Sequence, residues 1–86
     1  MNPRVINVKA NHDFSLHILF TNNEWRKFDV KPYLDKGIFK QLQNRDMFIS
    51  CRAVDGTVQW ANEADFCPDT LFLESTLVQS SSADAL

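Results

Sequence analysis

The chain has 86 residues, 44% of them hydrophobic, and a formal net charge of −2. A chain of this length closes a single hydrophobic core, and its apolar fraction excludes intrinsic disorder, so we expect one globular domain. No apolar run approaches the roughly 20 residues that a membrane span needs, and the first residues lack the basic and then apolar order of a signal peptide. These features predict a cytoplasmic protein that does not contact a membrane.

Three β-strands are predicted at the start of the chain because apolar and polar residues alternate there with a period of two. The strands are expected at residues 5–10, 15–20 and 25–30, and Asn22 and Asn23 tolerate the backbone of a tight hairpin turn. The short turns predict an antiparallel meander. The side chains expected on its buried face are Ile6, Val8, Ala10, Leu16, Ile18, Phe20, Phe28 and Val30.

Short helical segments are predicted in the middle of the chain. Pro32 near the start and Gly37 beyond the end favour a single helical turn between them. Residues 38–43 follow as a short amphipathic helix, and residues 46–49 add one more turn. The packed side of the amphipathic helix is expected to carry Ile38, Phe39 and Leu42.

A second hairpin and a last helix are predicted in the remaining part of the chain. The Asp-Gly pair at residues 55–56 is a strong hairpin signal, and it lies between β-like runs at residues 51–54 and 57–60. Pro68 suits the first position of a helix that is expected to end near Glu74.

These elements predict an α+β fold. Its small, mainly antiparallel sheet comprises the N-terminal three-strand meander and the second hairpin, and the short helices pack on it. We expect one domain over residues 1–78. Residues 79–86 are rich in Ser and have nothing to bury, so they are expected to form a disordered tail.

Few residues suited to catalysis or metal binding occur together. Fifteen residues lie between Cys51 and Cys67, which fits neither a zinc site nor a redox pair, so both thiols are expected to be reduced and structural. No nucleophile motif surrounds Cys51 or Cys67 as a partner for His12 or His17, and both glycines fall at predicted turns, which excludes a phosphate-binding loop. We therefore predict a protein that is not an enzyme and that uses no cofactor or metal.

Charge is distributed unevenly along the chain. Residues 53–86 carry six acidic residues and no Lys or Arg, whereas residues 24–52 carry seven basic and four acidic residues. Two interpretations are open, because the two parts can attract each other within the fold or the acidic part can meet a basic partner. Direct nucleic-acid binding is disfavoured because acidic residues are mixed among the bases and the pI is about 5.5.

The candidate partner-binding residues combine aromatic anchors with acidic and amide side chains. The two Trp residues are either exposed anchors or core residues, since large aromatic residues serve both roles. Asn62 and Asp65 are expected to stabilise the bend after residue 60 through side-chain to backbone hydrogen bonds. Asp65 and Asp69 also suit the positive start of a helix. The candidate set is Trp25, Trp60, Asn62, Glu63, Asp65 and Asp69.

Three stretches together resemble a known family. They are Phe-Asp-Val at residues 28–30, Leu-Asp-Lys-Gly at residues 34–37 and Trp-x-Asn-x-x-Asp at residues 60–65. With the elements around them they resemble, over residues 3–75, the bacterial family called domain of unknown function 2442. The chain departs from it in the bend after residue 60, at Ala61, where the family often has Pro, and at Glu63, where Gly is common.

The resemblance implies a small α+β domain with a mainly antiparallel sheet, short helices and no established catalytic activity. Members of the family are often encoded beside another small protein, which has invited a toxin-antitoxin interpretation, and some are fused to helix-turn-helix domains. We therefore expect a non-enzymatic protein-interaction module, the neutralising member of a toxin-antitoxin-like pair, with a small and basic protein as its partner. A homodimer is compatible with this hypothesis, because exposed strand edges can pair across a two-fold axis.

Two alternatives stay open. One is a small ligand-binding domain or enzyme with a groove between the sheet and the helices, and it requires its reactive side chains to meet in one pocket. The other is a regulator that contacts nucleic acid through a partner. The side chains that the first alternative would use are His12, His17, Cys51, Asp65 and Asp69.

Overall fold

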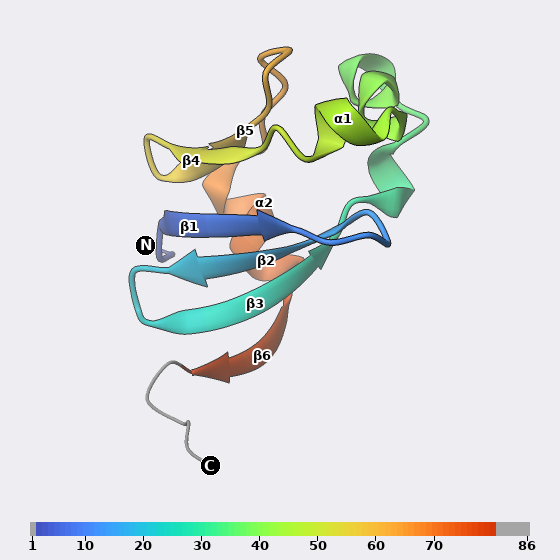
Figure 1. Ribbon diagram of the computed structural model, residues 1–86. Coiled ribbons are helices and arrows are strands. Elements are labelled where there is room, and N and C mark those ends of the chain that lie inside the picture. The colour runs from blue at the N-terminus through green and yellow to red at the C-terminus, as the bar shows by residue number, and fades with distance from the viewer. Residues whose placement is uncertain (1, 81–86) are drawn as a thin grey trace.

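The computed structural model describes residues 2–80, and its ribbon is shown in Figure 1. Within these residues, six strands, two short α-helices and two 3₁₀ segments follow one another. They are β1 (Val5–Ala10), β2 (Ser15–Phe20), β3 (Glu24–Asp29), η1 (Lys31–Tyr33), η2 (Gly37–Gln43), α1 (Arg45–Phe48), β4 (Arg52–Val54), β5 (Thr57–Gln59), α2 (Pro68–Leu73) and β6 (Thr76–Ser80).

Four strands form the main antiparallel sheet in the order β1-β2-β3-β6, and β4 and β5 form a separate two-stranded hairpin beside β1. Helix α2 lies behind the main sheet, and α1 lies beyond the end of β1 (Figure 1). The predicted α+β fold, with its meander and second hairpin, is confirmed. No helix in the described part of the chain has the length and apolar character to cross a membrane.

Strand β6 was not predicted. It runs antiparallel to β3 and makes residues 79 and 80 part of the sheet, so the expected tail does not begin at residue 79. The remaining residues of that tail, 81–86, lie outside the described residues. The run Thr76-Leu77-Val78 contains two β-branched residues, which favour a strand, but it is too short to show a period.

A β-bulge in β1 changes which residues of this strand face the core. Val5 pairs with Phe20 and Asn7 with Leu19, so Ile6 is an extra residue without a partner opposite it. The bulge puts Val5 on the core face at 4% exposure and leaves Ile6 51% exposed. The prediction that Ile6 points inward is therefore wrong.

The segment η2 is a 3₁₀-helix, and this changes the packing of its apolar residues. With three residues per turn, side chains at i and i+3 lie above one another, so Phe39 and Leu42 share the packed side. Leu42 is fully buried and Phe39 packs against the core, but Ile38 is 46% exposed. The expectation that Ile38 packs with them is wrong for this reason.

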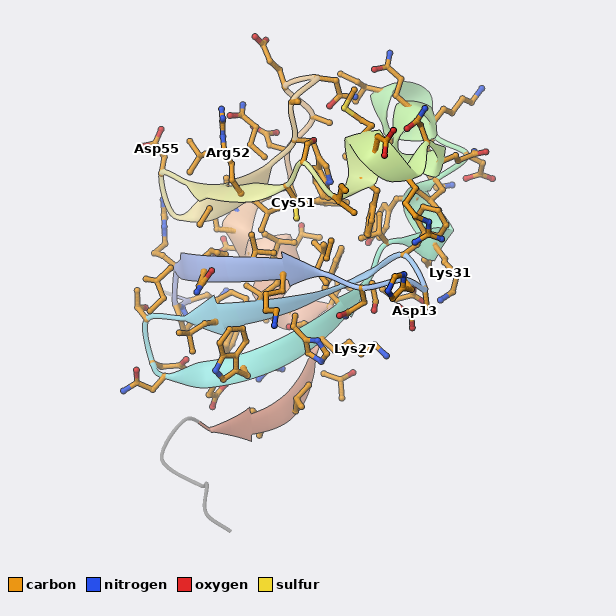
Figure 2. The ribbon with its side chains drawn as sticks, in the orientation of Figure 1. Asp13, Lys27, Lys31, Cys51, Arg52 and Asp55 are labelled. Atoms are coloured by element: carbon orange, nitrogen blue, oxygen red, sulfur yellow. The ribbon has the colours of Figure 1, made fainter. Side chains whose placement is uncertain are left out.

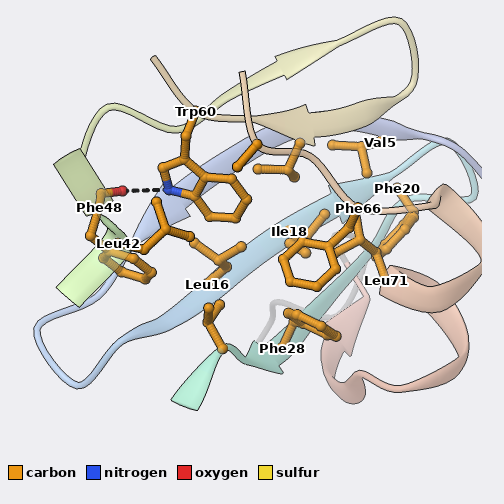
Figure 3. Close-up of a cluster of buried hydrophobic side chains, with 13 residues drawn as sticks. Val5, Leu16, Ile18, Phe20, Phe28, Leu42, Phe48, Trp60, Phe66 and Leu71 are labelled. Atoms are coloured by element: carbon orange, nitrogen blue, oxygen red, sulfur yellow. Dashed lines mark hydrogen bonds between the residues drawn. The ribbon is translucent and has the colours of Figure 1, made fainter. Parts of the chain in front are cut away.

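One core fills the space between the main sheet, the hairpin and the helices (Figure 3). Phe66 lies in its aromatic part, with ring centroids 4.6 Å from Phe39, 5.0 Å from Phe28 and 5.1 Å from Tyr33. Such edge-on and stacked pairs stabilise a core beyond the burial of their area. The buried hydrophobic residues of the described chain are Val5, Leu16, Ile18, Phe20, Phe28, Val30, Leu42, Phe48, Val58, Trp60, Ala64, Phe66 and Leu71.

Arg26 connects β3 to the turn between α2 and β6. Its guanidinium donates from Nε to the Ser75 hydroxyl at 2.8 Å and from Nη2 to the Ser75 carbonyl at 3.0 Å. Nη1 lies 2.9 Å from a carboxylate oxygen of Glu24, and the guanidinium carbon lies 4.4 Å from the centroid of the Phe72 ring. This single side chain therefore fixes the place where the last strand begins.

Candidate functional site

The stretch Thr-Val-Gln-Trp-Ala-Asn-Glu-Ala-Asp-Phe-Cys-Pro, residues 57–68, forms the corner between the hairpin and α2. Trp60 is 1% exposed, and its indole Nε1 donates to the Phe48 carbonyl at 2.8 Å (Figure 3). Its backbone N–H donates to the Ala64 carbonyl, which closes the bend. Trp60 is therefore a core residue, and the exposed-anchor interpretation is wrong for it.

Asn62 holds the corner by two hydrogen bonds. Its side-chain oxygen accepts from the Ala64 N–H at 3.0 Å, as predicted for the bend, and its Nδ2 donates to Gln41 Oε1 at 2.9 Å. The neighbouring Ala61 N–H donates to the Ser50 hydroxyl at 3.1 Å. The corner is thus tied to η2 and to the turn after α1, and a Pro at position 61 would lack the donor for the second tie.

We expect Asn62→Ala to lower the free energy of unfolding by about 0.5–2 kcal/mol, as loss of a cap or turn bond does. The reason is that the Ala64 N–H and the Gln41 side chain both lose their partner. Urea denaturation followed by circular dichroism measures this difference. An unchanged unfolding curve together with weaker partner binding would instead assign Asn62 to recognition.

Glu63 has a backbone φ of 70°, in the left-handed region that favours Gly. We expect Glu63→Gly to raise the free energy of unfolding by up to about 1 kcal/mol, because Gly removes the Cβ repulsion at this φ and the Glu side chain is exposed. Glu63→Ala keeps the Cβ and is the matched control. Urea denaturation followed by circular dichroism measures the stability of both variants. If Glu63→Gly and Glu63→Ala stabilise the protein equally, relief of the Cβ repulsion at this φ is not the cause.

The acidic candidates lie at the surface around this corner. Glu63, Asp65 and Asp69 are exposed there, Asp55 is exposed at the turn of the β4-β5 hairpin, and we call these four carboxylates the acidic rim. Asp65 forms an isolated backbone bridge with Gln59, while the hydrogen bond predicted for its side chain is not found among residues 2–80. Asp69 accepts from Asn2 Nδ2 at 3.3 Å. The Thr57 hydroxyl donates to the Phe66 carbonyl and holds the rim segment against β5.

The ion pairs of the described chain leave the acidic rim free. Four pairs lie within 4.0 Å, and all four carboxylates come from residues 13–35, whereas no carboxylate among residues 53–80 takes part. The two parts of the chain are therefore not joined by ion pairs in the region described. The pairs are Arg26 with Glu24 at 2.9 Å, Lys27 with Asp13 at 3.4 Å, Lys31 with Asp29 at 3.3 Å and Lys36 with Asp35 at 3.9 Å.

Asp13 has the most strongly altered carboxyl group. The Ser15 hydroxyl donates to it at 2.5 Å, and this hydrogen bond, with Lys27 and Lys31 nearby, lowers its pKa to about 2. Figure 2 shows Asp13 beside Lys31 at the end of the sheet. Lys31 also donates to the Asp13 carbonyl at 3.1 Å. These contacts fix the turn between β1 and β2, where Phe14 has a φ of 61°.

Trp25 occupies a different surface from the acidic rim. It pairs with Leu19 on β2 and lies on the face of the main sheet opposite the core, half-buried. A shallow hollow of about 290 Å³ is lined there by Lys9, His17, Trp25 and Val78. Trp25 therefore does not join the other candidate residues in one site.

A larger groove lies next to the corner. Its volume is about 530 Å³, and most of its polar groups are already engaged within the fold. The Asn44 side chain accepts from the Met47 N–H at 3.2 Å, and the Ser50 hydroxyl donates to the Met47 carbonyl at 2.5 Å. The groove is lined by Gln41, Asn44, Asp46, Met47, Ser50 and Ala61.

The side chains that an enzyme would use do not meet in any of the hollows described above. His17 lies on the open sheet face, His12 is exposed between β1 and β2, and Cys51 is partly buried beneath β4. Asp65 and Asp69 lie at the corner. Within residues 2–80, no three His, Cys, Asp or Glu side chains lie close enough to hold a metal ion.

The two thiols differ in environment, and they are free and not joined to each other. Burial raises the pKa of the Cys51 thiol to about 11, whereas Cys67 is exposed. At pH 8 we expect one thiol to react rapidly with a disulfide reagent, because only about one in a thousand Cys51 side chains is a thiolate. Cys67→Ser should remove the rapid phase, and a rapid phase that persists in this variant would contradict the assignment.

Comparison with curated proteins and with solved structures finds no match to this chain. A family model does match, and it covers residues 5–76, which include every strand from β1 to β5, the corner and α2. The matched segment also contains the stretches that suggested the resemblance, at residues 28–30, 34–37 and 60–65. The chain therefore belongs to the family described as Protein of unknown function (DUF2442).

Proposed function

We propose that the chain is a non-enzymatic protein-interaction module that binds a small basic protein through its acidic rim. The proposal rests on one observation, the contrast between two groups of carboxylates. Those between residues 13 and 35 are all within 4.0 Å of a basic side chain, whereas those of the acidic rim are exposed and have no such partner among residues 2–80. Exposed carboxylates are negatively charged and attract a positively charged partner.

The rim is supported by a rigid part of the fold. The loop that carries Glu63 and Asp65 rises above the β4-β5 hairpin, at the side of the molecule opposite β6 (Figure 1). Buried Trp60, the Asn62 side chain and the backbone bridge at Asp65 hold this loop in place. Little conformational entropy is lost when such a preformed surface binds, which favours recognition.

The chemistry of the rim determines what kind of partner fits. Long-range attraction speeds association and selects basic partners, and it weakens as salt shortens the Debye length, which is about 8 Å at physiological strength. Arg52 is the last basic residue of the sequence, so residues 53–69, which carry the acidic rim, contain no Lys or Arg. A neutralising role in a two-protein pair is the form of this function that the family resemblance suggested.

The test begins with capture of partners from host lysate on the tagged chain, at about 50 mM and about 500 mM salt. Basic proteins released by salt are then purified, and their Kd is measured against the wild type and two double variants. Glu63→Gln with Asp65→Asn, the rim variant, removes the charge of two of the four rim carboxylates, and Asp29→Asn with Asp35→Asn is the control with the same change in net charge. Both variants keep the size of the side chains.

We expect the rim variant to weaken binding about tenfold or more and to reduce its salt dependence, while the control changes Kd by less than about threefold. Equal weakening by both variants would show that net charge alone attracts the partner. Binding that is unchanged by salt and by the rim variant would overturn the proposal. Circular dichroism of each variant shows that the fold is intact.

A further inference from the structure

The two edges of the main sheet differ in whether another segment of the chain covers them. At the β1 edge, the Val5 N–H donates to the Gly56 carbonyl at 2.9 Å, and the β4-β5 hairpin lies alongside (Figure 1). At the opposite edge, β6 pairs only with β3, and among residues 2–80 no other segment pairs with its free side. An unpaired edge presents backbone N–H and C=O groups to any strand that can pair with it.

Exposed apolar side chains lie on β6 and at the end of α2, which precedes it in the chain. Leu73, Leu77 and Val78 are 66%, 50% and 48% exposed, and they account for half of the large exposed hydrophobic residues among those described. Leu77 pairs with Arg26, whose side chain lies over Phe72 of α2, so Leu77 faces the same side as α2. Val78 lines the hollow on the other side. Both sides of the edge are therefore apolar.

The edge lacks the charged residues and the Pro that most often keep strands from pairing. Residues 75–80 carry no charge and no Pro, the residue types that commonly protect an edge. A bulge is present in β6 itself, where Val78 is the extra residue between the pairs Trp25–Gln79 and Arg26–Leu77, and it bends the strand at this point. An antiparallel copy of this strand would bring no like charges together within residues 75–80, and it would place apolar side chains against their own copies.

We infer that β6 pairs antiparallel with β6 of a second copy of this chain, across a two-fold axis, and joins the two sheets into one of eight strands. A self-pairing strand fits the uncharged, apolar edge better than the basic partner of the acidic rim, which would gain no charge complementarity there. The hairpin and the loop of the rim lie on the other side of the molecule, so the two surfaces are independent (Figure 1).

The test measures the mass of the full chain in solution. Sedimentation equilibrium from about 1 to about 500 μM should show the mass rising from 9.9 kDa towards twice that value. Leu77→Lys places a charge beside the edge and should raise the dimer dissociation constant about tenfold or more. Ile49→Lys is the matched control, because Ile49 is 58% exposed and follows α1, and it should change that constant less than about threefold.

Hydrogen exchange of the wild type tests the same pairing without a variant. Amides of β6 should exchange more slowly as the protein concentration rises, while those of β1 stay unchanged, because only the β6 edge gains hydrogen bonds. If Leu77→Lys fails to fold, this experiment still tests whether β6 pairs with β6 of a second copy.

A mass of 9.9 kDa at every concentration would overturn the inference, as would a dimer that Ile49→Lys disrupts and Leu77→Lys does not. Protection of β6 that appears only when an added partner protein is present would assign the edge to strand addition by that partner, and it would likewise overturn the dimer. If the dimer is overturned in this way, the charge test of the acidic rim is unaffected, because neither the rim variant nor its control changes a residue of β6.

Discussion

Trp60→Ala is expected to lower the free energy of unfolding by about 3–5 kcal/mol. The indole is 1% exposed, its ring centroid lies 5.8 Å from that of Phe66, and its Nε1 donates to the Phe48 carbonyl at 2.8 Å. The substitution removes a large buried area, leaves a cavity and leaves that carbonyl without its donor. Small domains have total stabilities of about 5–15 kcal/mol, so the variant is expected to be marginal at best.

Trp60→Phe retains most of the buried area and separates the hydrogen bond from the packing. We expect a loss of about 1–3 kcal/mol for this variant, because the Phe48 carbonyl stays buried without a donor. Trp25→Phe is the control of the same chemistry on the open sheet face, and its loss should be below about 1 kcal/mol. Chemical denaturation followed by circular dichroism measures all three. Equal losses at the two Trp positions would contradict the assignment of Trp60 to the core.

Arg26→Ala is expected to cost about 2–3 kcal/mol, the second-largest effect. Its side chain is 16% exposed, and its guanidinium donates to both the hydroxyl and the carbonyl of Ser75 while it pairs with Glu24. The Ser75 hydroxyl still donates to the Phe72 carbonyl at 2.8 Å after truncation, but the Ser75 carbonyl and the Glu24 carboxylate lose the donors that Arg26 supplies, which costs more than the net strength of those bonds themselves.

Arg26→Lys keeps the charge but has no planar fork, so it cannot bond both Ser75 groups in the same way and should restore less than half of the loss. Lys27→Ala is the neighbouring control, since this side chain is about half exposed and its pair with Asp13 contributes at most about 1 kcal/mol. Thermal and chemical denaturation compare the variants. Full rescue by Lys would show that charge alone, and not the fork, holds β6 to β3.

The meander was predictable because its signals are local. Alternation in β2 puts Leu16, Ile18 and Phe20 on one face, and the structure buries all three. The Asp-Gly turn at residues 55–56 is equally local, with both residues at positive φ as a primed hairpin turn requires. The bulge at Ile6 was not predictable, because nothing in the sequence marks where an extra residue leaves the pairing.

The candidate site depended on the arrangement in space, which the sequence does not contain. Trp25 lies at the start of a β-like run and Trp60 at the end of one, and only the packing against Phe48 and Phe66 distinguishes the buried Trp60 from the half-buried Trp25. The charge of residues 53–86 was apparent from composition, but whether those carboxylates find internal partners was not. The sequence did contain one signal for the ion pairs, because three of the four join residues only one or two positions apart.

The order of the strands in the sheet also determines the order in which they can pair during folding. β1, β2 and β3 are neighbours in the chain and close over short turns, but Ser75 meets Arg26 across 49 positions. Pairings of such separation carry a larger loop-closure entropy and form late in folding. Until residues 76–80 dock, β3 is itself an open edge. The folding intermediate most exposed to aggregation is therefore expected to be a three-stranded meander that awaits its last strand.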